Sequence, residues 1–579
     1  MISGQRPSPD RRDAPPPLAR GARRFRIDGV RKEAMEVARN RVLVTAAMFF
    51  IGFVVMGVRL LDLGFFERVV ETTIAAQGRA PVLTARADIV DLNGVVLATN
   101  LKTASLYADP KRVIDVDDAL DKLQVALPDI NRADIVNRLS ADSRFVWIKR
   151  NLTPAEKWRI NSLGIPGFAF EDEDRRVYPQ GRLAAHVLGF VDIDGRGLAG
   201  IERFFDSRLM NPHSLHEPLK LALDVRVQHI LREELANAVD AFSAIGAAGL
   251  VLDARTGEVL SMVSLPDYDP NEPKASRKET LFNRAVQGVY ELGSGLKTFT
   301  VAMALDSGHA RLESTYDATK PLKIARFTIN DYHAKARWMS LPEVFIHSSN
   351  IGTARMGMEI GAETQRAYLD RLGLLKRPQI ELTEAAEPLL PHPWREISTM
   401  TVAFGHGIAI TPLHLAAGMA AVVNGGRLIP ATLLAQDADN STSVEARRVL
   451  SSETSATMRR LLRLAVIEGT GGKADVPGFE VGGKTGSAEK SAAGGYRRNA
   501  LLSSFIATFP TDEPRYVVLA IIDEPKGTPE TFGYATGGWT AAPVVGRVIA
   551  RIGPMLGVSP RQDQENAIRN ALLLPVREE

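Results

Sequence analysis

The stretch Ser294-Gly-Leu-Lys297, followed by the apolar run Thr298-Phe-Thr-Val-Ala-Met-Ala-Leu305, decides the fold of the central part of this chain. Gly293 and Ser294 fit the start of a helix, and the apolar run predicts that this helix is buried. Positions three apart share one face of a helix, so Ser294 and Lys297 would lie side by side. A serine next to a lysine that burial keeps unprotonated is an activated nucleophile. We therefore expect Ser294 to face a cleft, with its backbone N–H near the developing oxyanion.

Two further motifs follow in a fixed order. Ser348-Ser-Asn350 comes after a predicted helix or turn at 341–346 and is predicted to be a loop that reaches into the cleft. We expect Ser348 to relay a proton to the leaving amine, and Asn350 to hold Lys297 or the substrate amide. Lys484-Thr-Gly486, flanked by small residues, is predicted to be a strand that passes the nucleophile.

The predicted strand supplies a carboxylate-binding surface. A strand edge offers main-chain hydrogen bonds to an extended peptide, and Lys484 adds positive potential. The hydroxyls of Thr485 and Ser487, with Gly486 between them, are expected to bind a terminal carboxylate. The implied substrate is a peptide with a free C-terminus. The candidate catalytic residues are Ser294, Lys297, Ser348, Asn350 and Lys484, and the candidate substrate-binding residues are Thr485, Gly486 and Ser487.

Each motif taken alone is weak evidence. A second Ser-x-x-Lys pattern, Ser487-Ala-Glu-Lys490, shows how easily such a pattern arises, and most isolated examples are solvated helix faces. The ordered set of three motifs matches the signature of penicillin-recognising serine enzymes. Residues 478–485 also satisfy the phosphate-binding P-loop pattern, but a P-loop needs an apolar strand before it and a helix after it. The neighbouring sequence fits neither requirement, which disfavours a nucleotide hydrolase.

These residues resemble the class B penicillin-binding proteins, and among them the division-specific septal transpeptidases. Besides the three motifs, the resemblance includes Tyr290-Glu-Leu-Gly293 and Phe404-Gly-His-Gly-Ile-Ala-Ile-Thr411-Pro412 in the catalytic part. Upstream, Arg86-Ala-Asp-Ile-Val-Asp-Leu-Asn-Gly94, Arg176-Val-Tyr-Pro179 and Gly200-Ile-Glu202 are similar to that family's non-catalytic pedestal. The resemblance covers nearly the whole chain beyond its N-terminal tail.

The expected fold is α+β in several parts. The catalytic domain, at 219–557, is expected to be a penicillin-binding transpeptidase domain, with an antiparallel sheet that has helices on both sides. A mixed α/β pedestal is expected at 62–218, and a peripheral C-terminal tail at 558–579. The 579 residues and 45% hydrophobic content suit two or three domains with full cores.

The N-terminal region predicts a membrane anchor. Residues 1–41 hold eleven Lys and Arg against five acids and are predicted to be a disordered tail. An uncharged apolar run at 42–58, extended to 61 beyond Arg59, is just long enough for a spanning helix. The basic flank predicts a cytoplasmic N-terminus, a single pass through the bacterial inner membrane and a periplasmic catalytic domain. The alternatives, a buried core helix or a cleaved signal peptide, fit the flanks and the length less well.

The resemblance implies a peptidoglycan D,D-transpeptidase that cross-links stem peptides ending in D-Ala-D-Ala through a serine acyl-enzyme, and that β-lactams trap. It also implies partners at the membrane, namely a SEDS-type glycan polymerase and other divisome proteins, with no nucleic acid. The motifs imply no cofactor and no metal. The alternatives are an elongation-type class B transpeptidase, a D,D-carboxypeptidase or serine β-lactamase, a β-lactam-sensing receptor, an inactive scaffold and a bifunctional glycan polymerase.

Overall fold

The computed structural model describes residues 39, 43, 45–57, 86–324, 327–436, 446–492, 495–561 and 565–573. The chain divides into two compact units, Met1–Leu83 and Thr84–Glu579. In the first unit, residues 45–57 are helical, and most of them are exposed. Among the described residues, no helix is long and apolar enough to span a membrane. The predicted tail at 1–41, apart from residue 39, and both ends of the predicted anchor at 42–61 lie outside the described residues.

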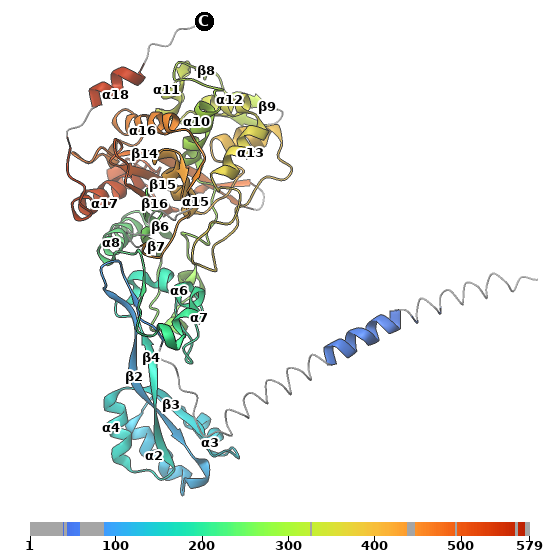
Figure 1. Cartoon of the computed structure of the whole chain (residues 1–579), viewed down its shortest axis with the longest axis vertical. Helices are drawn as coiled ribbons and strands as arrows, with labels where there is room; N and C mark the ends of the chain where they lie inside the picture. Colours follow the sequence, from blue (N-terminus) through green and yellow to red (C-terminus); the bar gives the residue numbers. More distant parts are fainter. Residues whose placement is uncertain are drawn as a thin grey trace, which may run out of the picture. The chain divides into compact units, whose positions relative to one another are not determined.

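The second unit opens with a sheet built around one long strand, β2 (Val96–Ala108). Its antiparallel partners are β1 (Ile89–Val90), β3 (Val146–Leu152) and β4 (Phe168–Val177). Helices α2 (Val116–Ala126), α3 (Arg132–Leu139) and α4 (Pro154–Leu163) form an apolar cluster with one face of this sheet (Figure 1). Helix α2 begins after Asp115, whose side chain accepts from the N–H groups of Asp117 and Asp118 and so caps the helix.

A buried ion cluster follows in the pedestal. It lies next to the short helices α5 (Ala185–Leu188), α6 (Gly200–Phe204) and α7 (Asp206–Leu209). Glu202 is fully buried and accepts hydrogen bonds from Arg86 (2.5 Å) and Arg176 (2.7 Å). The three segments that resemble a pedestal therefore meet at one carboxylate. Strand β5 (Leu219–Lys220) pairs in parallel with β1, so residues predicted to open the second domain close the pedestal sheet instead.

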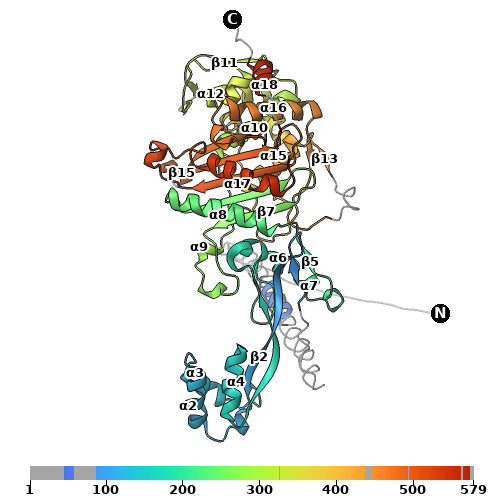
Figure 2. The same cartoon turned by 90° about the vertical axis from the view of Figure 1, so that its left-hand side faces the viewer.

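The catalytic part is built on a five-stranded antiparallel sheet with the order β14-β15-β16-β6-β7. These strands span Gly482–Ala492, Gly495–Phe509, Tyr516–Asp523, Gly246–Asp253 and Val259–Leu265, in that order. Side chains alternate between two cores, as strand geometry requires. Val518 and Ile522 face α8 (Val225–Ala241) and α17 (Ala541–Met555), while Leu519 faces the opposite cluster. Figure 2 shows α8 and α17 together beside this sheet.

The opposite face of the sheet carries a helical layer. It includes α10 (Lys297–Asp306), α15 (Pro412–Val423) and α16 (Ser452–Ile467). Every residue of α10 from Lys297 to Ala304 is buried, as the apolar run predicted. The remaining helices are α9 (Lys278–Leu281), α11 (Leu341–Ile346), α12 (Asn350–Ile360), α13 (Ala362–Arg371), α14 (Glu396–Ala403) and α18 (Glu565–Leu572).

Short two-stranded pairs and the last helix complete the fold. The paired strands are β8 (Thr315–Asp317) with β11 (Trp338–Ser340), β9 (Leu322–Ile324) with β10 (Phe327–Ile329), and β12 (Arg427–Leu428) with β13 (Arg447–Arg448). Helix α18 packs against α16, with Leu572 fully buried. The segment beyond 558, which we expected to be peripheral, thus contributes a side chain to the core.

Candidate active site

The nucleophile motif lies on a tight turn that leads into α10. Ser294 belongs to the 3-10 helix η5 (Gly293–Leu296), and the α-helix begins at Lys297. The helical start that we predicted at Ser294 is therefore a 3-10 turn. Ser294 is partly exposed, whereas Lys297 is fully buried. Ser294 is thus accessible to a substrate, while the lysine three positions later is shielded from water.

The ammonium group of Lys297 connects the first motif to the second. Its Nζ donates hydrogen bonds to Asn350 Oδ1 (2.7 Å), Ser348 Oγ (3.1 Å) and the Ser348 carbonyl oxygen. We expected Asn350 to hold either Lys297 or the substrate amide, and its Oδ1 contacts Lys297. The Nζ of Lys484 also donates to Ser348 Oγ, over 3.0 Å. One hydroxyl therefore lies between the two lysines.

The second motif lies in a turn between α11 and α12. Ser348 has a left-handed backbone (φ 59°), and Ser349 caps α12 through the N–H of Gly352. Asn350 is the first residue of α12, so the loop we predicted ends one residue earlier than expected. Two preceding residues support this turn: the Asn330 carbonyl accepts from Asn350 Nδ2 (2.9 Å), and the Asp331 carboxylate accepts from Ser349 Oγ (2.7 Å).

The third motif lies on β14, as predicted. This strand pairs only with β15 within the sheet described above, so its other edge is free to receive an extended peptide. Lys484 is buried, and Thr485 Oγ1 lies 2.6 Å from Thr470 Oγ1. Ser487 Oγ accepts from the N–H of Gly537 (3.0 Å). Because β14 continues to Ala492, no helix follows Lys484, which excludes the P-loop alternative.

The backbones of the first and third motifs are in direct contact. A Cβ added at Gly486 would lie 2.7 Å from the Leu292 carbonyl oxygen and 2.3 Å from Ser504 Oγ. A Cβ at Gly293 would lie 2.6 Å from the Ser487 carbonyl oxygen. Only glycine permits this approach, so these two positions set the distance between the nucleophile and the strand edge.

Burial controls the protonation of the two lysines. Burial lowers the pKa of Lys297 well below its usual value, and the charge of Lys484 lowers it further, while Asp331 opposes the shift. Burial lowers the pKa of Lys484 to about 7. Lys297 is therefore suited to accept a proton near neutral pH, and Lys484 is charged below a pH of about 7.

A polar contact at the entrance of the nucleophile turn was not predicted. Glu291 accepts hydrogen bonds from the N–H of Gly407 (3.0 Å) and from the hydroxyl of Tyr496 (2.9 Å). The ring of His406 packs edge-on against Tyr496, and burial, with the charge of Lys297, lowers the pKa of His406 to about 4. Glu291 and His406 lie inside stretches that resemble the family, but no local pattern links them to Tyr496.

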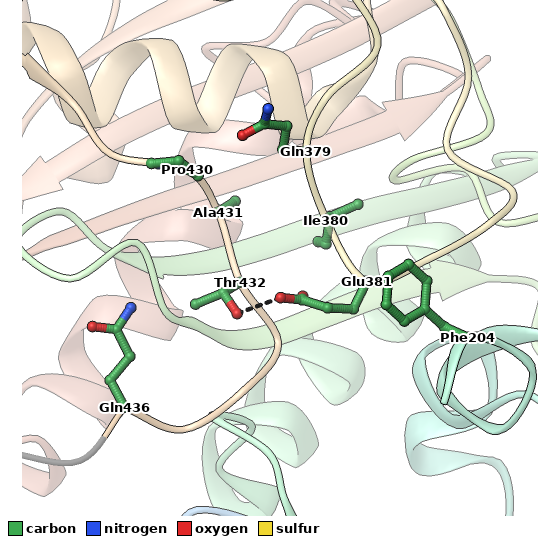
Figure 3. Close-up of a pocket in the computed structure, with 8 residues that line it drawn as sticks. All are labelled: Phe204, Gln379, Ile380, Glu381, Pro430, Ala431, Thr432 and Gln436. Carbon is green, nitrogen blue, oxygen red and sulfur yellow. Dashed lines mark hydrogen bonds between the residues drawn. The ribbon is translucent and has the colours of Figure 1, made fainter. Parts of the chain in front are cut away.

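An open pocket of about 470 Å³ lies away from the three motifs (Figure 3). It is lined by Phe204, Gln379, Ile380, Glu381, Pro430, Ala431, Thr432 and Gln436. The hydroxyl of Thr432 donates to Glu381, which also accepts from the N–H of Leu433. None of these residues belongs to a predicted motif. In the part of the chain that the structure describes, no group of three or more His, Asp or Glu residues is placed to hold a metal ion.

Comparison with known families agrees with the geometry of the site. The model of the penicillin-binding protein transpeptidase domain matches residues 247–550, and that of the penicillin-binding protein dimerisation domain matches residues 81–211. The chain belongs to the penicillin-binding protein transpeptidase family. The first match contains all three motifs, and the second contains the buried Glu202 cluster.

Individual relatives cover most of the chain. The probable peptidoglycan D,D-transpeptidase FtsI of Caulobacter vibrioides is 44% identical over 537 residues, which is 90% of each chain. Peptidoglycan D,D-transpeptidase FtsI of Escherichia coli is 29% identical, over 83% of this chain and 85% of its own. The crystal structure of penicillin-binding protein 3 from Mycobacterium tuberculosis superposes with a TM-score of 0.64 at 23% identity, over 83% of this chain and 97% of that one. This structure shows the same fold.

Proposed function

We propose that this protein is a serine-type peptidoglycan D,D-transpeptidase that acts in septal cell-wall synthesis. The observation that carries the proposal is the shared hydroxyl of Ser348, which lies 3.1 Å from Lys297 Nζ and 3.0 Å from Lys484 Nζ, while Ser294, three residues before Lys297, is partly exposed. The septal role follows the relatives named FtsI.

In the first half of the reaction, Ser294 Oγ attacks the carbonyl carbon of the penultimate D-Ala. Its proton passes to the neutral Nζ of Lys297, and the carbonyl oxygen becomes an oxyanion near backbone N–H groups of the nucleophile turn. Collapse of the tetrahedral intermediate breaks the peptide bond. The terminal D-Ala leaves after its nitrogen has taken a proton through Ser348, and the acyl group stays on Ser294.

In the second half, an amine of a neighbouring stem peptide attacks the acyl carbon. The amine loses a proton through Ser348, and Ser294 Oγ regains its proton as the ester bond breaks. The product is an amide cross-link, and the free enzyme is restored. A β-lactam would acylate Ser294 in the same way, but its amine remains tethered to the acyl group.

The substrate is held along β14. Lys484 provides positive potential, and Thr485 and Ser487 have hydroxyls on the side of the strand where Thr470 and the Gly537 N–H also lie. An extended peptide paired with the free edge would place its terminal carboxylate near these groups.

The acceptor distinguishes this proposal from its closest rival. A D,D-carboxypeptidase would use the same residues but transfer the acyl group to water. Purified full-length protein, supplied with a donor pentapeptide and an acceptor stem peptide, should give more cross-linked dimer than released tetrapeptide. Tetrapeptide as the only product would support the carboxypeptidase.

The cellular setting is part of the proposal. We expect residues 42–61 to anchor the protein in the inner membrane, with the basic tail in the cytoplasm and the catalytic part in the periplasm. Partners of the anchor and pedestal would be a SEDS-type glycan polymerase and other divisome proteins.

Two experiments test this setting. Depletion that produces filaments would support the septal role, whereas round cells would support the elongation-type alternative. A reporter active only outside the cytoplasm should work when fused after Glu579 and fail when fused before Arg41, and the reverse would contradict this topology.

A further inference from the structure

Residues 330–337, which precede the second motif, have one side that faces the site and one that faces solvent. The inner side supports the site, because Asn330 and Asp331 hold Asn350, Ser349 and the N–H of Ile351. The other end of the segment is fixed to α11, because Arg337 donates to Glu343 (2.6 Å), which also caps the helix. The residues in between, at 332–336, are all exposed.

The exposed side carries positive charge next to the site. Lys335 and His333 are exposed, and the single acid between 330 and 338, Asp331, is already engaged with Ser349 and Ile351. Burial lowers the pKa of His347, the residue before Ser348. The charges of Lys335 and Arg337 lower it further, while that of Glu343 opposes the shift. We name His333, Lys335, Arg337 and His347 the basic strip; its charge comes mainly from Lys335, since Arg337 forms an ion pair with Glu343.

An aromatic side chain accompanies the strip. Tyr332 is 71% exposed, and its ring packs edge-on against His333 at 4.7 Å. The exposed ring adds apolar surface next to the charge of Lys335.

The proposed reaction brings an anionic peptide to this place. The attacking amine must reach the acyl carbon on Ser294 and give its proton to a group near Ser348. The donor peptide occupies the edge of β14, so the rest of the acceptor must leave the site on another side. The surface that adjoins Ser348 through His347 is the basic strip. Stem peptides carry free α-carboxylates several bonds from their amine, and these complement the charge of the strip.

We infer that the basic strip binds a carboxylate of the acceptor stem peptide during the second half of the reaction. This inference rests on the proposed transpeptidase function and deepens it. The strip would have a second effect: positive charge near the incoming amine favours its neutral form, which is the form that attacks. Arg337 forms an ion pair with Glu343, which caps α11, so a change at Arg337 would disturb the helix. Lys335 is therefore the residue to change in a test of the strip.

The test measures transfer with two matched acceptors. The full-length protein receives a thioester of an N-acylated D-alanine as donor. Each acceptor is an N-acetylated tripeptide amide, L-Ala-γ-D-Glu followed by lysine or diaminopimelate, whose side-chain amine attacks the acyl-enzyme. Each is compared with the same compound in which D-isoglutamine replaces D-Glu. The two members of a pair differ only in the α-carboxylate of the second residue, which is distant from the attacking amine. Aminolysis is measured against hydrolysis, and acylation by a fluorescent penicillin is measured separately.

The inference predicts a selective loss. Lys335→Glu should raise the KM of the D-Glu acceptor about tenfold, which corresponds to about 1.4 kcal/mol, and should change that of the D-isoglutamine acceptor less than about twofold. Lys335→Gln should have an intermediate effect. Penicillin acylation and the melting temperature should not change.

The matched control is Lys320→Glu, an equal change of charge at an exposed lysine next to Asp317. It should leave the KM values of both acceptors unchanged.

Three results would contradict the inference, and they can be told apart. Equal KM values for Lys335→Glu and the unmodified protein would show that the strip does not bind the acceptor. An equal loss with both acceptors, or slower penicillin acylation, would show that Lys335 acts on the second motif instead. An unmodified protein that is acylated by penicillin but transfers to no acceptor would contradict the proposed transpeptidase function itself.

Discussion

Lys484 donates a hydrogen bond from its Nζ to Ser348 Oγ over 3.0 Å, although 136 residues separate the two in the chain. The same oxygen lies 3.1 Å from Lys297 Nζ. A hydroxyl oxygen has two lone pairs, so Ser348 Oγ can accept from both lysines. Two charged ammonium groups around one partly exposed oxygen would repel each other. The geometry therefore favours one neutral lysine. Burial and the charge of Lys484 both lower the pKa of Lys297, which suits Lys297 to be the neutral one.

The role of Lys297 as the base leads to the first prediction. Lys297→Ala should slow acylation by penicillin by roughly a thousandfold or more, because the residues of such a site act as a unit. Asn350→Ala should have a smaller effect, since Ser348 still contacts the lysine. The measurement is the second-order acylation rate constant. An Asn350 variant slower than the Lys297 variant would contradict the role of Lys297 as the base.

The pKa of Lys484, at about 7, leads to a prediction of pH dependence. Lys484 is charged below this pKa and neutral above it, so attraction of a substrate carboxylate should weaken as the pH rises from 7 to 9. The acylation rate constant of a penicillin with a free carboxylate should fall over this range, while that of its methyl ester should not. Lys484→Arg, which keeps its charge, should lose the falling limb even if it is slower at every pH. A falling limb that persists in this variant would assign the titration to another group.

Asp331 provides the third prediction. Its carboxylate accepts from Ser349 Oγ and from the N–H of Ile351, so its removal leaves two groups at the start of α12 without this acceptor. Asp331→Ala should lower stability by about 1–2 kcal/mol and slow acylation, because Ser348 and Asn350 lose their support. Asp331→Asn keeps an acceptor oxygen and should retain more of both. Chemical unfolding and penicillin acylation measure the two effects, and an Ala variant with unchanged acylation would contradict the support role.

The contact between the first and third motifs gives the fourth prediction. A Cβ at Gly486 would lie 2.3 Å from Ser504 Oγ and 2.7 Å from the Leu292 carbonyl oxygen. The second of these atoms belongs to the backbone, so a change of side-chain rotamer cannot relieve the clash. Gly486→Ala should therefore push β14 away from the nucleophile turn and reduce acylation strongly. Gly295→Ala is the matched control, because its Cβ would meet only Leu415, at 3.5 Å. Similar rates for the two variants would show that this close approach does not position the nucleophile.

Local sequence patterns predicted the elements that carry the motifs, because each pattern is set by residues close in the chain. The buried run after Lys297 is a helix, and the small residues around Lys484 form a strand. Strands β6 and β7 pair as a hairpin, with Gly257 between them at a positive φ of 79°.

Groups that approach each other only through the tertiary fold were not predicted. Thr470 against Thr485, the Gly537 N–H against Ser487 and Tyr496 against Glu291 join positions far apart in the chain. Nothing in the local composition of these residues marks their partners. The same reason explains the parallel pairing of Leu219–Lys220 with β1, which was not predicted.

Peptide mapping after labelling tests the central claim most directly. The full-length protein, labelled with a fluorescent penicillin and digested, should carry the label on Ser294. Ser294→Ala should abolish labelling, while Ser487→Ala should only slow it, because Ser487 contributes a hydroxyl that accepts from the N–H of Gly537. A label on Ser487, or on any residue outside the peptide that contains Ser294, would contradict the assignment of the active site.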